Sequence, residues 1–309
     1  MANRFRRDCI KTAVVMATAV VFSANANGQD LEPRTYANTP VGLNFLIAGY
    51  GYTAGGVAAD PALPIDNTRL ELHSGVLAYA RALDVYGKSA KFDVALPYAS
   101  LQGSATVLGQ ERDREVAGLI DPRFHFSMNF FGAPALSLEE FVKYEQDTIV
   151  GTNIEVTAPG GQYDASKLAN LGTNRWSIKP ELGVSKRMGP VTLELASGIR
   201  FYTDNDDFFG GKLRSQDPVY SVQGHLIYHV THGIWVAADA TFYTGGQTRV
   251  DGHKNDDNLE NSRAGVTLAL PVSRANSIKL YYSTAISGRR GSEFDTTGIA
   301  WQYRFGGGL

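Results

Sequence analysis

The stretch Trp301-Gln302-Tyr303-Arg304-Phe305, close to the C-terminus, carries an aromatic ring at every second position. A period of two puts the three rings on one face of a β-strand and the glutamine and arginine on the other face. Segments of about ten residues with the same alternation recur through most of the chain. This pattern predicts an all-β protein in which Trp301, Tyr303 and Phe305 belong to the closing strand.

The first 28 residues predict a secretory signal peptide that is removed on export through the inner membrane. Basic side chains between Arg4 and Lys11 precede an apolar run from Thr12 to Phe22, and Ala24-Asn25-Ala26 fits a small-x-small cleavage pattern. The apolar run is shorter than the roughly 20 residues that a membrane-spanning helix needs. Charged or polar residues interrupt every later apolar run, so we expect one domain over residues 29–309 that enters a membrane, if at all, through strands.

Cysteine content and charge exclude several kinds of site and partner. The only cysteine, Cys9, lies in the predicted signal, which leaves the mature chain without a thiol for a disulfide, a metal site or a nucleophile. The net charge of the whole chain is −2, and this balance argues against nucleic acid as a partner. We expect neither a cofactor nor a metal.

The alternating segments predict about twelve antiparallel strands, an even number as in bacterial barrels. Long and short connections alternate along the chain, as expected if both termini lie at the periplasmic end. The exception is the insertion 131–146, in which Ser137-Leu138-Glu139-Glu140 reads as a capping box and predicts a short periplasmic helix. Segment 43–53 has apolar residues on both faces, so its register stays open. The predicted long loops are 54–68, 103–114, 160–173, 204–217 and 245–261, with a moderate one near 288–294.

Alternation alone does not decide whether the apolar face points out of the barrel or into it. A soluble barrel keeps this face inside, whereas a membrane barrel turns it to lipid and lines its lumen with polar residues. Charged residues lie on the non-apolar face of the clear strands, and an Arg or Lys facing lipid at mid-bilayer would cost about 2–4 kcal/mol. We therefore predict a transmembrane antiparallel β-barrel in a Gram-negative outer membrane, with membrane lipid and the barrel-insertion machinery as partners.

Five short stretches carry a family resemblance across nearly the whole mature chain. They are 34–42, 92–98, Asp121-Pro122-Arg123-Phe124, 203–211 and 298–305. Together they resemble a bacterial outer-membrane family named after the meta-cleavage pathway of phenol degradation. The resemblance implies a barrel that passes or senses hydrophobic or aromatic compounds, and it carries over no catalytic residues.

Charged and histidine side chains on the polar strand faces are the candidates to line the lumen. As rings of charge they would select solutes, as in channels; as a salt-bridged filling they would instead stiffen the wall and block passage, and both interpretations stay open. The candidates are Lys91, Asp93, Arg123, His125, Glu155, Lys179, Glu181, Glu194, Arg200, His225, Asp239, Arg263, Lys279 and Arg304.

One predicted loop combines an acidic run with two aromatic residues. Asp204-Asn205-Asp206-Asp207 resembles the start of a calcium loop, but Phe209 and Ser215 occupy the positions where the motif has Gly and Glu. We expect a solvated acidic loop, with Phe208 and Phe209 as candidates for an inward-folded gate.

Together these features predict a passive channel for a small hydrophobic or aromatic solute, and not an enzyme. An outer-membrane hydrolase is one alternative, which needs a Ser–His pair oriented by a third polar group. Ser221 and His225 share a strand face, but at roughly 3.3 Å per residue they stand about 13 Å apart. A purely structural envelope barrel is the other alternative.

Overall fold

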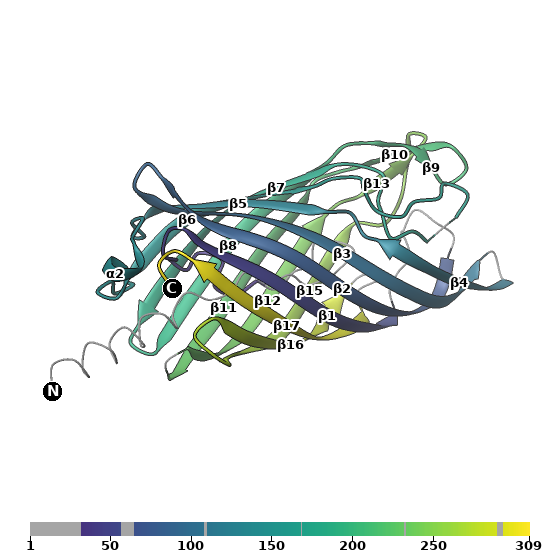
Figure 1. Cartoon of the computed structure of the whole chain (residues 1–309). Coiled ribbons are helices and arrows are strands. Elements are labelled where there is room, and N and C mark those ends of the chain that lie inside the picture. The colour runs from purple at the N-terminus through teal and green to yellow at the C-terminus, as the bar shows by residue number, and fades with distance from the viewer. Residues whose placement is uncertain (1–31, 57–64, 108–109, 168, 232, 289–292) are drawn as a thin grey trace, which may run out of the picture.

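The computed structural model describes residues 32–56, 65–107, 110–167, 169–231, 233–288 and 293–309. The predicted signal peptide, Cys9 and parts of several predicted loops lie outside the described residues. Thirteen strands form one sheet that closes on itself through the pairing of β2 with β3 (Figure 1). The wall strands are β1 (Leu43–Gly56), β2 (Ile65–Val85), β3 (Lys88–Val107), β4 (Gln110–Leu119), β5 (Arg123–Phe131), β6 (Thr148–Thr157), β7 (Ser177–Met188), β8 (Val191–Tyr202), β11 (Val219–Thr231), β12 (Ile234–Gly245), β15 (Leu259–Pro271), β16 (Asn276–Gly288) and β17 (Glu293–Gly306).

Strands β4 and β5 are two halves of one position in the wall. Both pair with β3: β4 opposite its residues 98–107 and β5 opposite its residues 90–95. The protein is therefore a closed antiparallel barrel of 12 strands, as predicted. The closing pair is β1 with β17, where Leu43 lies opposite Gly306 and Gly56 opposite Glu293.

The alternation along the closing strand is the one read from the sequence. Trp301 and Tyr303 point outward and are 44 % and 36 % exposed, while Gln302 and Arg304 are buried inside. The rings of Trp301, Tyr303 and Phe305 stack in sequence, with centroids 6.2 Å and 5.7 Å apart. Other large apolar side chains also face outward, so the exterior of the barrel is the surface that a membrane covers.

The two ends of the barrel differ. The C-terminus, the short helix α2 (Leu138–Phe141) and the short turns lie at one end, here called the terminal end (Figure 1). The turn between β2 and β3 consists of Tyr86 and Gly87, whose φ angles of 52° and 75° are those of a tight hairpin turn. The predicted capping box is present, because Ser137 and Glu140 bond each other reciprocally at the start of α2. Among the described residues, no helix is long and apolar enough to cross a membrane.

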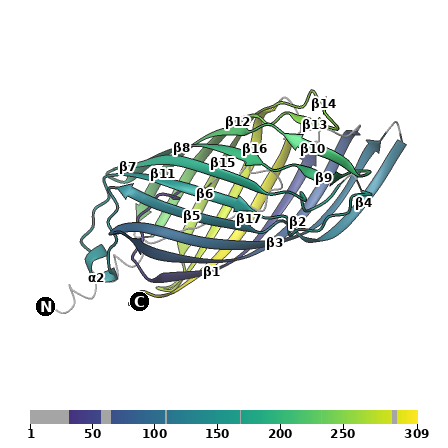
Figure 2. The same ribbon diagram turned by 90° about the horizontal axis from the view of Figure 1, so that it is seen from above.

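The opposite end, here called the loop end, contains more regular structure than the sequence predicted. The predicted loop 103–114 is wrong, because β3 and β4 continue their ladder almost to the tip of the hairpin. The predicted loops 204–217 and 245–261 are interrupted by short strands, since backbone groups of the two loops pair with each other (Figure 2). These strands form a second sheet of β9 (Asn205–Phe208), β10 (Lys212–Gln216), β13 (Thr248–Val250) and β14 (His253–Lys254).

Candidate functional site

The structure places the predicted lumen residues on the inner face of the wall. All of them are buried except Lys179, whose side chain is 13 % exposed. Their role in selecting solutes stays a prediction.

One group of these residues forms a continuous ionic network across several strands. His125 of β5 lies between two carboxylates, with its Nδ1 2.9 Å from Asp93 and its Nε2 2.6 Å from Glu155. The three residues are neighbours because the register places Asp93 and Glu155 directly opposite His125. Arg200 of β8 completes the network at 2.5 Å from Glu155. Charges removed from water need such partners, so this side of the lumen holds compensated charge.

A second group surrounds Glu181 of β7. Its carboxylate accepts hydrogen bonds from Gln223 at 2.8 Å and from the Tyr36 hydroxyl at 2.8 Å, and it pairs with Lys179 at 2.9 Å. Sequence alone does not show that Tyr36, which precedes the first strand, reaches this carboxylate.

His225 is held by Asp239 and not by a serine. Its Nδ1 lies 2.7 Å from Asp239, whose other oxygen accepts a hydrogen bond from Thr267 at 2.9 Å. The Ser221 hydroxyl donates instead to the Gly198 carbonyl oxygen at 3.4 Å. The Ser–His pair considered for a hydrolase is therefore not formed by these two residues. Within the described part of the chain, no cluster of His, Cys, Asp and Glu side chains is placed to hold a metal ion.

One sector of the inner wall is apolar, and the sequence did not predict it. On β1, the residues Leu43, Phe45 and Ile47 point inward, while Leu46 and Tyr50 point outward and are 45 % and 49 % exposed. This resolves the register that the sequence left open: both faces of β1 are apolar because one meets lipid and the other meets an apolar part of the lumen.

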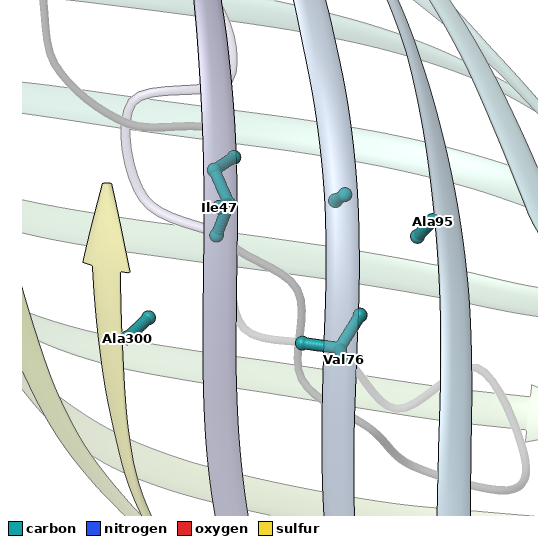
Figure 3. Close-up of a cluster of buried hydrophobic side chains, with 5 residues drawn as sticks. Ile47, Val76, Ala95 and Ala300 are labelled. Carbon is teal, nitrogen blue, oxygen red and sulfur yellow. The ribbon is translucent and has the colours of Figure 1, made fainter. Parts of the chain in front are cut away.

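This sector, here called the apolar stripe, runs along β17, β1, β2, β3 and β4. In its middle, Ile47, Val76, Ala95 and Ala300 come together from four neighbouring strands (Figure 3). The inward alanines at every second position of β2 are the sequence signal that could have revealed it. The stripe consists of Leu43, Phe45, Ala80 and Ala82 towards the terminal end, then Ile47, Val76, Ala78, Ala95 and Ala300, then Leu72, Ala99, Leu101 and Val116 towards the loop end, where Leu171 from the connection between β6 and β7 packs against them.

Residues 32–42, here called the plug, precede β1 and lie inside the barrel. The Arg34 amide donates to Glu194 at 2.6 Å, and the Thr35 carbonyl oxygen accepts from the Lys91 ammonium at 2.6 Å. Asn129 donates to the Tyr36 carbonyl oxygen at 3.1 Å. Because these partners belong to β8, β3 and β5, the plug crosses the lumen from wall to wall.

Two glycines make room for the plug. A Cβ atom at Gly183 would lie 2.1 Å from the Tyr36 ring, and one at Gly151 would lie 2.8 Å from it. The two glycines face each other in the register of β6 and β7, so their missing side chains leave a recess for Tyr36. In the sequence, residues 34–42 stood out only through the family resemblance.

At the loop end, Asp121 anchors a segment that covers the outer edge of β4. Its carboxylate accepts from the amides of Gly160, Gly161 and Thr173 and from the Thr173 hydroxyl, at 2.6 to 3.1 Å. The Gln162 amide then donates to the Leu119 carbonyl oxygen of β4 at 2.7 Å. This segment takes the place of a paired strand beside β4.

The two gate candidates lie at the start of the second sheet. Phe208 is buried beneath the Arg214 guanidinium, which stands 5.3 Å from the ring centroid, and Phe209 is half-buried. A gating role for either residue stays a prediction. The acidic side chains Asp204, Asp206 and Asp207 are exposed, in line with a solvated loop.

Comparison with known proteins adds a family and a fold. Residues 49–303 match a family model described as "Putative MetA-pathway of phenol degradation". None of the curated proteins matches the chain. A solved outer membrane channel from Pseudomonas putida F1 is similar with a TM-score of 0.75 at 20 % identity, over 89 % of this chain and 100 % of that one.

The β domain of the Bordetella autotransporter BrkA is similar with a TM-score of 0.50 at 9 % identity, over 85 % of this chain and 100 % of that one. At such identities these structures show a shared barrel fold. The family match covers most of the chain and confirms the resemblance seen in the short stretches. The protein therefore belongs to the family described as "Putative MetA-pathway of phenol degradation".

Proposed function

We propose that the protein is an outer-membrane channel for the passive passage of small hydrophobic or aromatic compounds. The observation that carries the proposal is the apolar stripe, which extends along the inner wall from the loop end to the terminal end. The family match and the apolar exterior support the outer membrane as its location. In this proposal the loop end faces the outside and the terminal end faces the periplasm.

The stripe offers a solute a sequence of weak apolar contacts. Each Å² of apolar surface removed from water contributes about 25 cal/mol, so a small aromatic ring gains from contact with the stripe. Alanine side chains form much of the middle of the stripe, and they give shallow contacts rather than one deep pocket. Passage requires such weak, repeated sites, because a solute that binds tightly at one site does not leave it.

The ion pairs of the inner wall and the plug have different roles in this proposal. The ion pairs around His125 and Glu181 hold the opposite wall and leave the stripe as the favourable surface for an apolar solute. The plug narrows the lumen, so it must shift or leave a path beside it during passage. Neither step involves chemistry on the solute. Lipid and, during biogenesis, the barrel-insertion machinery are the partners that this proposal implies, with Trp301, Tyr303 and Phe305 in the strand that the machinery recognises.

The test is uptake of labelled benzyl alcohol by vesicles that carry the purified barrel under a lipopolysaccharide outer leaflet, which slows passage through lipid. Val76→Asn places an amide in the stripe and is expected to reduce uptake several-fold. Thr241→Asn makes a matched change on the inner wall of β12, outside the stripe, and is expected to leave uptake unchanged. Uptake no faster than in empty vesicles would contradict the proposal.

A further inference from the structure

Two buried donors lie next to each other in the lumen without a hydrogen-bond acceptor in the part of the chain that the structure describes. Lys279 of β16 and Trp235 of β12 are 6 % and 0 % exposed. Neither the Lys279 ammonium nor the Trp235 indole N–H has a hydrogen-bond partner among the described residues. The ammonium nitrogen stands 5.3 Å from the centroid of the indole ring. Because buried polar groups are normally paired, two unpaired donors side by side indicate a place for an acceptor from outside the chain.

The acidic groups near Lys279 do not fill this place. Asp239 and Glu32 act on Lys279 through their charge, but neither accepts a hydrogen bond from its ammonium. Both oxygens of Asp239 are engaged, one by His225 at 2.7 Å and the other by Thr267 at 2.9 Å.

Cations gather around the same indole. The Arg34 guanidinium lies 5.5 Å from the Trp235 ring centroid, so two cations flank one aromatic ring. Lys91 adds a further positive charge that acts on Lys279. Two cations therefore lie against Trp235, in a region that also holds the acidic groups Asp239 and Glu32.

The wall surface beside Trp235 is apolar. Trp235 packs with Ile227, Ala237 and Ala269 in one buried cluster. In the sheet register, Lys279 lies between two alanines, Ala269 on β15 and Ala300 on β17. Ala300 is also part of the apolar stripe (Figure 3). A solute that moves along the stripe thus passes the ammonium.

We propose that Lys279 and Trp235 bind the carboxylate of a small aromatic acid in the lumen. The ammonium and the indole N–H donate to the carboxylate oxygens, and the apolar cluster around Trp235 contacts the ring of the solute. This inference rests on the proposed channel function and names a class of its solutes.

The test follows the fluorescence of Trp235 during titration with benzoate. The chain has three tryptophans, and Trp176 and Trp301 lie on the exterior, so a W176F/W301F background leaves Trp235 as the only indole. In folded protein in detergent, benzoate is expected to change this fluorescence saturably, whereas inorganic phosphate, which has no ring, is expected to bind at least tenfold more weakly.

Two lysine variants in this background separate the site from a general effect of charge. Lys279→Met is expected to weaken benzoate binding at least tenfold. Lys212→Met, which removes an exposed lysine of the second sheet at the loop end, is expected to change it less than twofold. Circular dichroism checks folding, and Lys279→Gln replaces Lys279→Met if that variant does not fold.

Each contrary outcome has a defined meaning. Equal benzoate affinity in the native protein and in Lys279→Met overturns the site, and equal affinity for phosphate and benzoate overturns the aromatic-acid assignment. Absence of benzoate binding while vesicles still take up benzyl alcohol overturns the inference and leaves the channel intact. Absence of both overturns the proposed function as well.

Discussion

At the scale of single residues, the fit between Tyr36 and two glycines holds the plug against the inner wall. The ring occupies the recess over Gly151 and Gly183, and its hydroxyl bonds Glu181 at 2.8 Å. A hydrogen bond to a charged group contributes about 1.5–3 kcal/mol. A single methyl group in the recess therefore acts on the whole plug.

Gly183→Ala is expected to raise ion conductance, because the new Cβ would lie 2.1 Å from the Tyr36 ring and must displace it. Single-channel recordings in planar bilayers measure the effect. Gly224→Ala is the control, since its Cβ would have 3.9 Å to the nearest atom. Unchanged conductance in Gly183→Ala would show that the ring does not limit the path.

The capping box of α2 makes one part of the terminal end sensitive to acid. The Ser137 amide and hydroxyl donate to the Glu140 carboxylate and hold its pKa below the ordinary value of 4.5. A lowered pKa in the folded state gives stability that is present above pH 4.5 and is lost as the pH falls through the lowered value. We expect α2 amides to lose protection from hydrogen exchange below that pH. Glu140→Gln keeps the cap without a titrating group, so the α2 amides of this variant should keep their protection over the same pH range.

At the scale of elements, the division of one wall position into β4 and β5 depends on Asp121. This residue lies between the two strands, and its carboxylate holds the segment 158–173 against β4. The Asp-Pro pair seen in the sequence therefore marks the point where a loop replaces a strand.

Asp121→Ala is expected to release this segment, because it leaves several donors without their acceptor, at a cost of at least about 2 kcal/mol. Limited proteolysis of the folded barrel should then cleave within 158–173 much faster. Asp164→Ala offers a comparison in the same segment, since this half-buried carboxylate accepts its hydrogen bonds from the nearby Ser166. Equal cleavage of both variants would argue against an anchoring role for Asp121.

At the scale of the whole molecule, the barrel has two unlike inner sides. The stripe lies on β17 and β1 to β4, and most of the ion pairs lie on the strands from β5 to β12. Reversing a charge on the side that carries the ion pairs should therefore change ion selectivity, with little effect on the uptake of apolar solutes.

Lys179→Glu is expected to increase the preference for cations several-fold. The substitution removes the ion-pair partner of Glu181 and adds a second carboxylate beside it. The reversal potential under a salt gradient reports the preference, and benzyl alcohol uptake by the same protein provides the control. An unchanged reversal potential would indicate that ions do not pass this residue.

The sequence predicts the barrel well because lipid and lumen impose a period of two on every strand. His125 and Glu181, which the alternation places on the polar strand faces, are buried on the inner wall. The stripe was missed because an apolar inner face on β1 gives no alternation to read. The plug and the second sheet were missed for a different reason: their contacts join segments far apart in the chain, such as Tyr36 with Glu181 and Arg214 with Val250.

The one-sided position of the stripe has a consequence for stereochemistry. A solute that keeps its ring against β1 and β2 cannot tumble freely, and it presents the same flank to the ionic wall throughout its passage. Mirror-image forms of a chiral solute would then meet that wall with different substituents. The barrel would accordingly conduct two enantiomers at unequal rates, although it performs no reaction on either.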